Sequence, residues 1–510
     1  MQSTISYQAS GTLPRFAWAA KFTPETGHIE VHHGDGVEIS PDGTKLVEGA
    51  WNGAFSEFGF NQSTVFSGTG MVKKQDELLF CSSTDRISAV FSVHKDGAIY
   101  VSNSPLFILQ LSGTSFLPLY PYYNSDILAI YRQGLYCLDG TTKLADGYKL
   151  HIHPSAIVAV SADGSIDCRS YDAGPEPTDF DDYRNILVDA LKELFKNGLD
   201  PARHTPLQSA SSLSRGYDSS ATTVLAKEAG CHKVYSFYDS KSDFPYSDCG
   251  NVGAEALGME CHTFDRWAYQ KMDRPVEAEF CYLSGGSNTP LVAMEDHLRD
   301  HIYVIGSAGA ESWNTKLLKH YHQLSSPWSR MVSGVSILEF RLRVGYIAID
   351  PSVIAIRHNQ AILKIFSKEE MQEWSVGGKY DRPAARRIAE QGGLPRELFG
   401  LKKLGTSHSP LKTRAGFSDR GYSSYSSFTK ESHQHCSRIA RIYRKTHFAI
   451  TYFLRYQLTS SGRKYVASTP LARKFPFILN AAPMRMSWDY VFALQWAANA
   501  LKERYYTHKR

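Results

Sequence analysis

The residues of this sequence best suited to chemistry form one hydroxyl-rich stretch. Its members, in order, are Ser214, Arg215, Gly216, Tyr217, Asp218, Ser219 and Ser220. The residues that follow favour a helix starting near Ser219, so backbone N–H groups and the helix dipole would converge here, as they do where proteins hold phosphate. A carboxylate such as Asp218 can face phosphate when Mg²⁺ lies between them. An ordinary N-capping turn is the alternative.

The elements around this stretch divide the chain into two kinds of structure. From about residue 15 to residue 168, short β-prone runs alternate with turn signals, and a strand over Val101–Leu111 is expected after the Lys95-Asp96-Gly97 turn. The segment Gly174–Thr178 contains two prolines and breaks the chain. Directly after it, apolar residues between Tyr183 and Phe195 fall at helical spacing.

At 510 residues the chain exceeds what one core usually organises. We therefore expect at least two domains, a β-rich one before the break and a helix-rich unit after it. Farther along the chain, Gly416–Ser432 is rich in Ser, Tyr and Gly and predicts a loop.

The stretch also resembles the phosphate loop of a known family, the PP-loop ATP pyrophosphatases, and within them the asparagine-synthetase-like amide ligases. That loop reads Ser-Gly-Gly-x-Asp-Ser, matched by Ser214, Gly216, Asp218 and Ser219, with Arg215 replacing the first glycine. Six further segments resemble the family in the same order and extend the resemblance over roughly residues 180–412. They are Val234–Tyr238, Asp248–His262, His301–Trp313, Leu338–Tyr346, Tyr380–Glu390 and Leu394–Gly405.

The N-terminal half resembles the Ntn-type glutaminase domain that accompanies this family. The regions Leu79–Leu109 and Leu138–Gly147 carry the likeness. Glutamine-using members have a cysteine after the initiator methionine, whereas this chain has Gln2. Without that thiol there is no nucleophile for glutamine, so the resemblance implies a domain without glutaminase activity.

The resemblance implies a fold class of α/β, or α+β overall. An Ntn-like β-rich sandwich over residues 1–175 would precede a PP-loop domain with a parallel sheet over 178–412. A basic helical C-terminal extension over 413–510 would follow. The implied activity is an AMP-forming carbon–nitrogen ligase that uses ATP and Mg²⁺. It would adenylate a small-molecule or peptide carboxylate, release pyrophosphate and pass the acyl group to an amine or to ammonia. A PP-loop enzyme that modifies tRNA or another nucleic acid, and a degenerate nucleotide-binding scaffold, are the alternatives.

The same resemblance assigns roles to residues outside the loop. Lys403 aligns with the lysine that stabilises acyl transfer, with Lys402 as the alternative register. Glu339 aligns near a glutamate that helps deprotonate the amine, although an ion pair with Arg341 or Arg343 is equally open. Nucleotide contacts are further expected from Phe237, Gly306 and Ser307. The second metal-binding carboxylate falls on Ala310 without a gap and on Glu311 with a shift of one residue, so Asp218 and Glu311 are the expected metal ligands.

Charge and composition give further expectations about partners and localisation. The net charge is +5, and between Lys402 and Lys474 many basic residues face only Asp419 and Glu431, which favours an acidic partner or a solvated surface. No stretch approaches the roughly 18 apolar residues of a membrane span. The eight scattered cysteines and a start without a signal pattern predict a cytoplasmic protein. A homodimer is left open.

Overall fold

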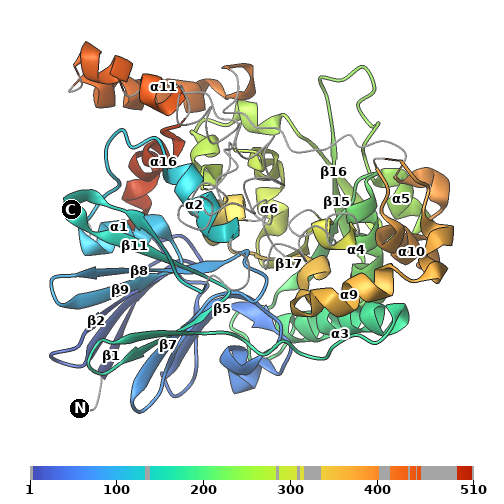
Figure 1. The fold of residues 1–510 in the computed structure, drawn as a ribbon, viewed down its shortest axis with the longest axis horizontal. Helices are drawn as coiled ribbons and strands as arrows, with labels where there is room; N and C mark the ends of the chain where they lie inside the picture. Colours follow the sequence, from blue (N-terminus) through green and yellow to red (C-terminus); the bar gives the residue numbers. More distant parts are fainter. Residues whose placement is uncertain are drawn as a thin grey trace, which may run out of the picture.

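The computed structural model describes residues 4–132, 138–282, 286–306, 310–314, 335–378, 380–400, 414–434, 437–443, 445–449 and 491–507. Their fold is mixed α/β and contains three sheets. Figure 1 shows the N-terminal strands at the lower left, a helix-covered sheet at the right and the C-terminal helices above. No helix in this described part of the chain combines the length and the apolar character needed to cross a bilayer.

The N-terminal half is a sandwich of two sheets. The seven-stranded sheet contains, in spatial order, β1 (Thr4–Ala9), β3 (His28–His33), β2 (Trp18–Thr23), β9 (Ala98–Ser102), β8 (Ala89–Lys95), β11 (Lys149–Pro154) and β10 (Gly140–Lys143). The six-stranded sheet contains β13 (Ile166–Arg169), β12 (Ile157–Ser161), β7 (Glu77–Cys81), β6 (Phe66–Lys73), β5 (Lys45–Trp51) and β4 (Glu38–Ile39). All neighbouring strands are antiparallel except β1 and β3.

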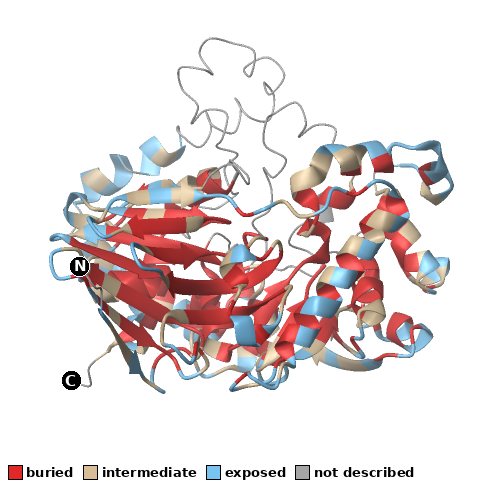
Figure 2. Ribbon diagram, turned by 90° about the horizontal axis from the view of Figure 1, so that it is seen from below, coloured by how far each residue is buried: buried red, intermediate tan, exposed pale blue. Residues whose placement is uncertain are grey.

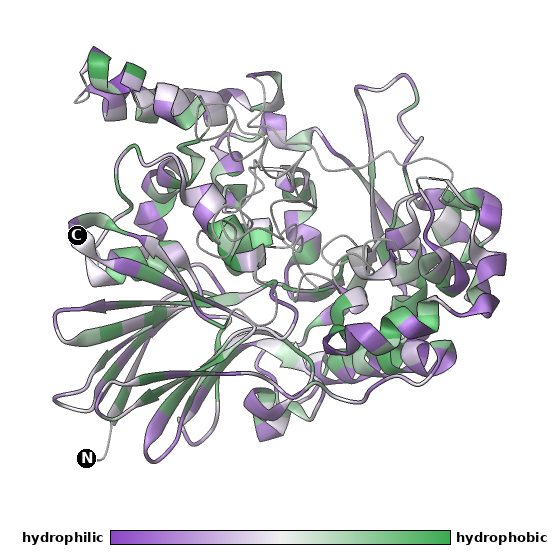
Figure 3. Cartoon of the chain, viewed as in Figure 1, coloured by the Kyte–Doolittle hydropathy of each residue, from purple (hydrophilic) through white to green (hydrophobic). Residues whose placement is uncertain are grey.

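Alternate side chains of both sheets fill the space between them. Trp18, Phe22 and Val101 from one sheet pack against Met71 and Phe80 from the other, and all five are buried. Figure 2 shows these strands as nearly continuous red, and Figure 3 shows the same strands as apolar with polar turns at their ends. The period-2 pattern of the sequence therefore produces the sandwich because each strand must bury one face.

Two helices cover the outer face of the seven-stranded sheet. They are α1 (Pro105–Ser112) and α2 (Tyr123–Arg132). The expected strand over Val101–Leu111 is therefore wrong beyond Ser102. Ser104 accepts hydrogen bonds from two backbone N–H groups of the next turn and so caps a helix, and a proline follows at its first position.

The second sheet system is parallel and five-stranded. Its order is β16 (Glu260–Asp265), β15 (Lys233–Tyr238), β14 (Gln208–Ser212), β17 (His301–Val304) and β18 (Ile347–Ile349). Every neighbouring pair is parallel. The first strand in the chain, β14, lies in the middle, so the order reverses between β14 and β17. In open α/β sheets, such a switch point leaves a crevice at the carboxyl ends of the strands, where ligands bind.

Helices connect and cover these parallel strands. They are α3 (Phe180–Gly198), α4 (Tyr217–Glu228), α5 (Asn251–Ala256), α6 (Glu295–Leu298), α8 (Leu338–Val344), α9 (Asn359–Phe366) and α10 (Pro383–Gln391). The helix expected after the Gly174–Thr178 break is α3, whose N-cap is Asp179. One apolar cluster joins α3 and α4 to the outer face of the sandwich, so the two halves share a continuous core.

The C-terminal helices pack where the two halves meet. They are α11 (Asp419–Gln434) and α16 (Ala493–Leu501), followed by the short 3₁₀ helix η17 (Lys502–Tyr505). The loop expected over Gly416–Ser432 is wrong, because most of it lies in α11. The buried carboxylate of Glu277 accepts from the backbone N–H of Ser418 at 2.5 Å, at the N-terminal end of this helix. An acceptor at that end stabilises the helix in spite of its Ser and Gly content.

Candidate functional site

The hydroxyl-rich stretch forms the turn between β14 and α4. The Ser214 and Ser219 hydroxyls lie 2.8 Å apart, and the backbone N–H of Ser214 donates to the Ser219 hydroxyl at 3.1 Å. The Ser220 hydroxyl donates to the Ser214 carbonyl at 3.4 Å. Gly216, at the N-cap position of α4, has no capping side chain. The turn is held by its own serines, and the positive end of α4 lies directly after it, beside the switch point of the sheet.

The phosphate loop of the resembling family has two successive glycines, at the positions of Arg215 and Gly216 here. Neither position requires glycine for its backbone conformation. Gly216 has φ −81° and ψ 155°, an extended conformation open to any residue. Arg215 is absent from the positive-φ residues of the described chain. The arginine that departs from the family pattern therefore costs the turn no backbone strain.

Gly306, which follows β17, approaches the start of α4 closely. A Cβ atom at this position would lie 2.7 Å from the Ser219 Cα and 2.9 Å from the Asp218 carbonyl oxygen. Its backbone N–H donates to the Ser212 hydroxyl at 3.3 Å. Glycine is thus required here by the close approach of two backbones, which holds the residues after β17 against the start of α4.

Two distant segments fasten the loop from outside. The backbone N–H of Arg215 donates to the Asp248 carbonyl at 3.2 Å, and the Arg215 carbonyl accepts from the N–H of Gly400 at 2.8 Å. Gly400 has φ +69°, and a Cβ there would lie 2.4 Å from the Tyr217 ring. The segment that ends at Gly400 is therefore bound directly to the loop.

The side chain of Tyr217 belongs to the core rather than to the crevice. It is fully buried, its hydroxyl accepts from the Arg386 guanidinium of α10, and its ring lies 4.8 Å from the Tyr380 ring. Its backbone N–H donates to the Tyr380 hydroxyl at 3.4 Å. Any nucleotide contact of Tyr217 would therefore involve its main chain.

Asp218 lies in the first turn of α4, and its carboxylate faces a buried arginine. The Arg382 Nε lies 3.8 Å from the Asp218 Oδ1, and the two side chains are 10% and 26% exposed. Arg382 immediately precedes Pro383, the first residue of α10. The sequence assigned no role to Arg382 or Tyr380. Both lie in Tyr380–Glu390, and only the family resemblance of that segment connected it with the loop.

Phe237 is half-buried near the carboxyl end of β15. It packs against an apolar cluster that includes Tyr235 and Ile305, whereas α4 packs within a different cluster on the other face of the sheet. Ser307 and Lys403 lie outside the described residues. The backbone of Glu311 belongs to the 3₁₀ helix Ala310–Trp313. Within the described part of the chain, no three His, Cys, Asp or Glu residues are grouped as a metal site.

Glu339 lies in α8, where the sandwich meets the C-terminal segment. Its carboxylate accepts from the Ser104 hydroxyl at 2.7 Å and from the Tyr505 hydroxyl. Burial raises the pKa of Glu339 to about 6, and these two hydrogen bonds partly offset the effect. The ion pair with Arg341 or Arg343 that the sequence left open is wrong. Arg341 binds Glu48, and Arg343 binds Glu279 and Glu295.

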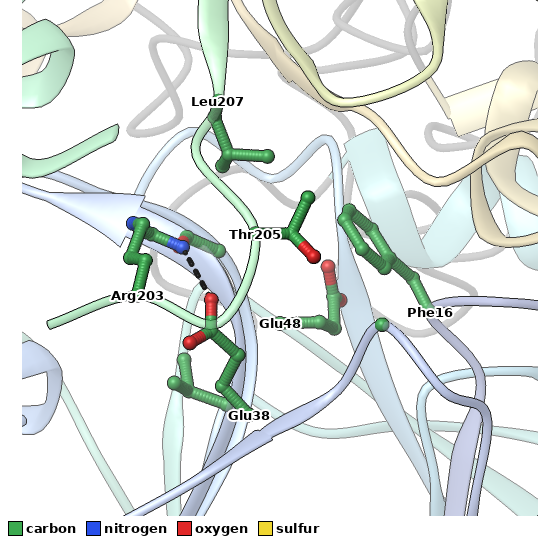
Figure 4. A pocket seen from close by; sticks show the side chains of 9 residues that line it. Phe16, Glu38, Glu48, Arg203, Thr205 and Leu207 are labelled. Atoms are coloured by element: carbon green, nitrogen blue, oxygen red, sulfur yellow. Dashed lines mark hydrogen bonds and ion pairs between the residues drawn. The ribbon is translucent and has the colours of Figure 1, made fainter. Parts of the chain in front are cut away.

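A small pocket lies at the contact between the two halves (Figure 4). Glu38, Glu48 and Arg203 line it together with apolar side chains. Arg203 donates to Glu38 at 3.0 Å, and Glu48 forms an ion pair with Arg341 at 2.6 Å. Because the charged groups of this pocket already form ion pairs, they are less available to a ligand than the polar groups of the turn between β14 and α4.

The chain matches no protein-family model and no curated protein. Among solved structures, a glutamine phosphoribosylpyrophosphate amidotransferase from B. subtilis, complexed with ADP and GMP, is 8% identical over 70% of this chain and 89% of that chain. The TM-score is 0.17. A likeness of this size carries no argument about fold or function.

Proposed function

We propose that this chain is an ATP-dependent ligase that adenylates a carboxylate and joins the acyl group to an amine or to ammonia. The nucleotide would bind at the switch point of the parallel sheet. Three features support this place: the hydroxyl-rich turn after β14, the N-terminus of α4 without a capping side chain, and the close approach of Gly306. Together they offer phosphate the N–H and O–H donors that such groups need.

The observation that carries the proposal is the hydrogen bond from Gly400 to Arg215. It joins the phosphate loop to the segment that precedes Lys402 and Lys403, although 185 positions separate the two residues in the chain. Lys403 follows Gly400 by three residues, and three residues of extended chain span at most about 11 Å. A lysine side chain so tethered would be able to serve chemistry at the loop.

Each residue would then have a separate role in the reaction. Bound ATP would supply the phosphoanhydride that activates the carboxylate as an acyl-adenylate. Asp218 would hold Mg²⁺ against the phosphates, with Glu311 as the second expected ligand, and carboxylates with substrate phosphates are the usual Mg²⁺ ligands. Lys403 would stabilise the oxyanion that forms when the amine attacks the acyl group. The tight backbone contacts around the loop would keep these groups in position before substrate binds.

Two measurements test the proposal. Calorimetry on the full chain should detect Mg²⁺-ATP, and Asp218→Ala should weaken its binding. Pyrophosphate release is then followed with candidate carboxylates and with amines or ammonia. Lys403→Ala should spare ATP binding but lower amide formation by about a hundredfold, the scale of one lost oxyanion donor.

Lys402→Ala is the matched control, because it removes the same charge one residue away. It should change amide formation much less. No ATP binding by the folded protein would refute the nucleotide site. ATP binding without amide formation from any carboxylate would favour the scaffold alternative. Equal activity of the parent and Lys403→Ala would remove the central residue from the mechanism.

A further inference from the structure

The segment before α10 brings a cation to the phosphate loop. Arg382 is 8% exposed, yet among the described residues its only hydrogen bond runs from Nη1 to the Asp381 carbonyl at 3.3 Å. Its distance to Asp218, 3.8 Å, exceeds that of a charge-assisted hydrogen bond. A guanidinium has five N–H donors, and burying them without acceptors is costly. Within the part of the chain that the structure describes, Arg382 thus has no anion at hydrogen-bond distance, and the Asp218 carboxylate faces it at 3.8 Å.

The neighbouring Tyr380 adds a second donor at the same place. Its hydroxyl oxygen accepts from the Tyr217 N–H, and within the described residues its own proton has no acceptor. A Cβ atom at Gly216 would lie 3.6 Å from this hydroxyl and 3.4 Å from that of Ser214. Tyr380 therefore borders the same small space, at the positive end of α4, as the serine hydroxyls.

The segment is held rigidly in this position. Pro383 begins α10 and restricts the backbone of Arg382 before it. The Arg386 guanidinium binds the Tyr217 hydroxyl, and a Cβ at Gly392 would lie 2.0 Å from the Val224 Cγ1, so α10 packs tightly on α4. A donor pair fixed in this way loses little entropy when an anion binds.

We propose that Arg382 and Tyr380 bind the pyrophosphate part of the nucleotide, beside the loop serines. The assignment rests on the proposed nucleotide site and names the cation and the hydroxyl that complete it. Arg382 would contribute charge-assisted hydrogen bonds to phosphate oxygens, for which the planar guanidinium fork is well suited. Tyr380 would donate one neutral hydrogen bond. Neither residue would contact the adenosine.

The test is calorimetry of the full chain with three ligands, which are Mg²⁺-ATP, Mg²⁺-pyrophosphate and adenosine. Arg382→Gln should weaken pyrophosphate and ATP binding about tenfold or more, and Tyr380→Phe about threefold. Adenosine binding should stay within about twofold of the parent, since adenosine carries no phosphate. The control is Arg396→Gln, which removes a 53% exposed arginine that binds Glu390 of α10. It should leave all three affinities unchanged.

Each outcome decides one point. If Arg382→Gln binds pyrophosphate as tightly as Arg396→Gln does, the inference is wrong while the nucleotide site stands. If Arg382→Gln does not fold, Tyr380→Phe carries the test, because it deletes one oxygen atom, and an unchanged pyrophosphate affinity then overturns the inference. A parent that binds pyrophosphate through Arg382 but neither ATP nor adenosine would refute the proposed ligase and keep the anion site.

Discussion

Two buried arginines in different regions of this molecule have opposite surroundings. Arg341, at the contact between the sandwich and the parallel-sheet half, binds both carboxylate oxygens of Glu48 at 2.6 and 2.9 Å. Arg382, beside the turn between β14 and α4, has its Nε 3.8 Å from the Asp218 carboxylate. A buried charge with a close bidentate partner holds a fold together. One without a close partner has the surroundings expected of a ligand-binding residue.

The difference extends to the neighbouring groups. Near Arg341, Glu48 also accepts from Thr69 at 2.7 Å and from Asn103 at 3.3 Å. The buried Glu279 is close to three arginines, Arg274, Arg343 and Arg504. At the turn between β14 and α4, by contrast, the Ser214 hydroxyl contacts that of Ser219, and the Ser220 hydroxyl donates to the Ser214 carbonyl. The polar groups of the contact region thus hold distant parts of the chain together, whereas these hydroxyls hold the turn itself.

The largest expected effect is the loss of the pair at the contact region. Arg341→Leu leaves Glu48 buried without its cation and should lower the free energy of unfolding by about 3–5 kcal/mol. Urea unfolding measures this cost. The double variant Glu48→Gln/Arg341→Leu removes both charges and keeps an acceptor for Thr69, so it should recover much of the loss. If the unfolding free energy of Arg341→Leu lies within about 1 kcal/mol of the parent value, the two arginines do not differ in their contribution to stability.

The next effect concerns Glu339, the buried carboxylate beside Ser104 and Tyr505. Its pKa is raised from 4.5 to about 6, so the folded protein holds the proton more tightly than the unfolded chain. The stabilisation from this proton is full below about pH 4.5 and is lost as the pH rises through 6. The loss amounts to about 2 kcal/mol.

Glu339→Gln removes this titration. Between pH 4.5 and 7, the variant should therefore gain about 2 kcal/mol of unfolding free energy relative to the parent. Urea unfolding at a series of pH values measures the difference. A constant difference between the two proteins across this range would show that Glu339 does not titrate as its burial requires.

The smallest expected effect is the stability of Arg382→Gln without ligand. Because Arg382 has no close ion pair to lose, the free energy of unfolding should change by less than about 1 kcal/mol. Mg²⁺-ATP should then raise the melting temperature of the parent more than that of the variant. A destabilisation as large as that of Arg341→Leu would mean that Arg382 is a structural residue.

The helical spacing from Tyr183 to Phe195 predicted a helix that lies within α3, because its apolar period matches the face that it buries. The family resemblance, rather than a local pattern, pointed to Val234–Tyr238, which lies within β15, and to Leu338–Tyr346, which contains α8. The strand expected beyond Ser102 was wrong for a local reason, the cap at Ser104. Other errors arose where a distant group decided the outcome. The helix over Asp419–Gln434 is one example, since Glu277 lies at its N-terminal end.

The sequence by itself determined the hydroxyl-rich turn, because closely spaced small and polar residues between a strand and a helix leave few other conformations. It also determined the β-rich first half and the helix that opens the second half through their periods, whereas the parallel sheet was implied only by the family resemblance. Only the tertiary structure decided which residues surround the turn. Arg382, Tyr380 and Gly400 reach it because α10 packs on α4, and long-range packing of this kind depends on the shapes of whole helices and leaves no local signal. Likewise, the ring and hydroxyl of Tyr217 were committed to the core by α10, although the sequence had grouped this residue with the site.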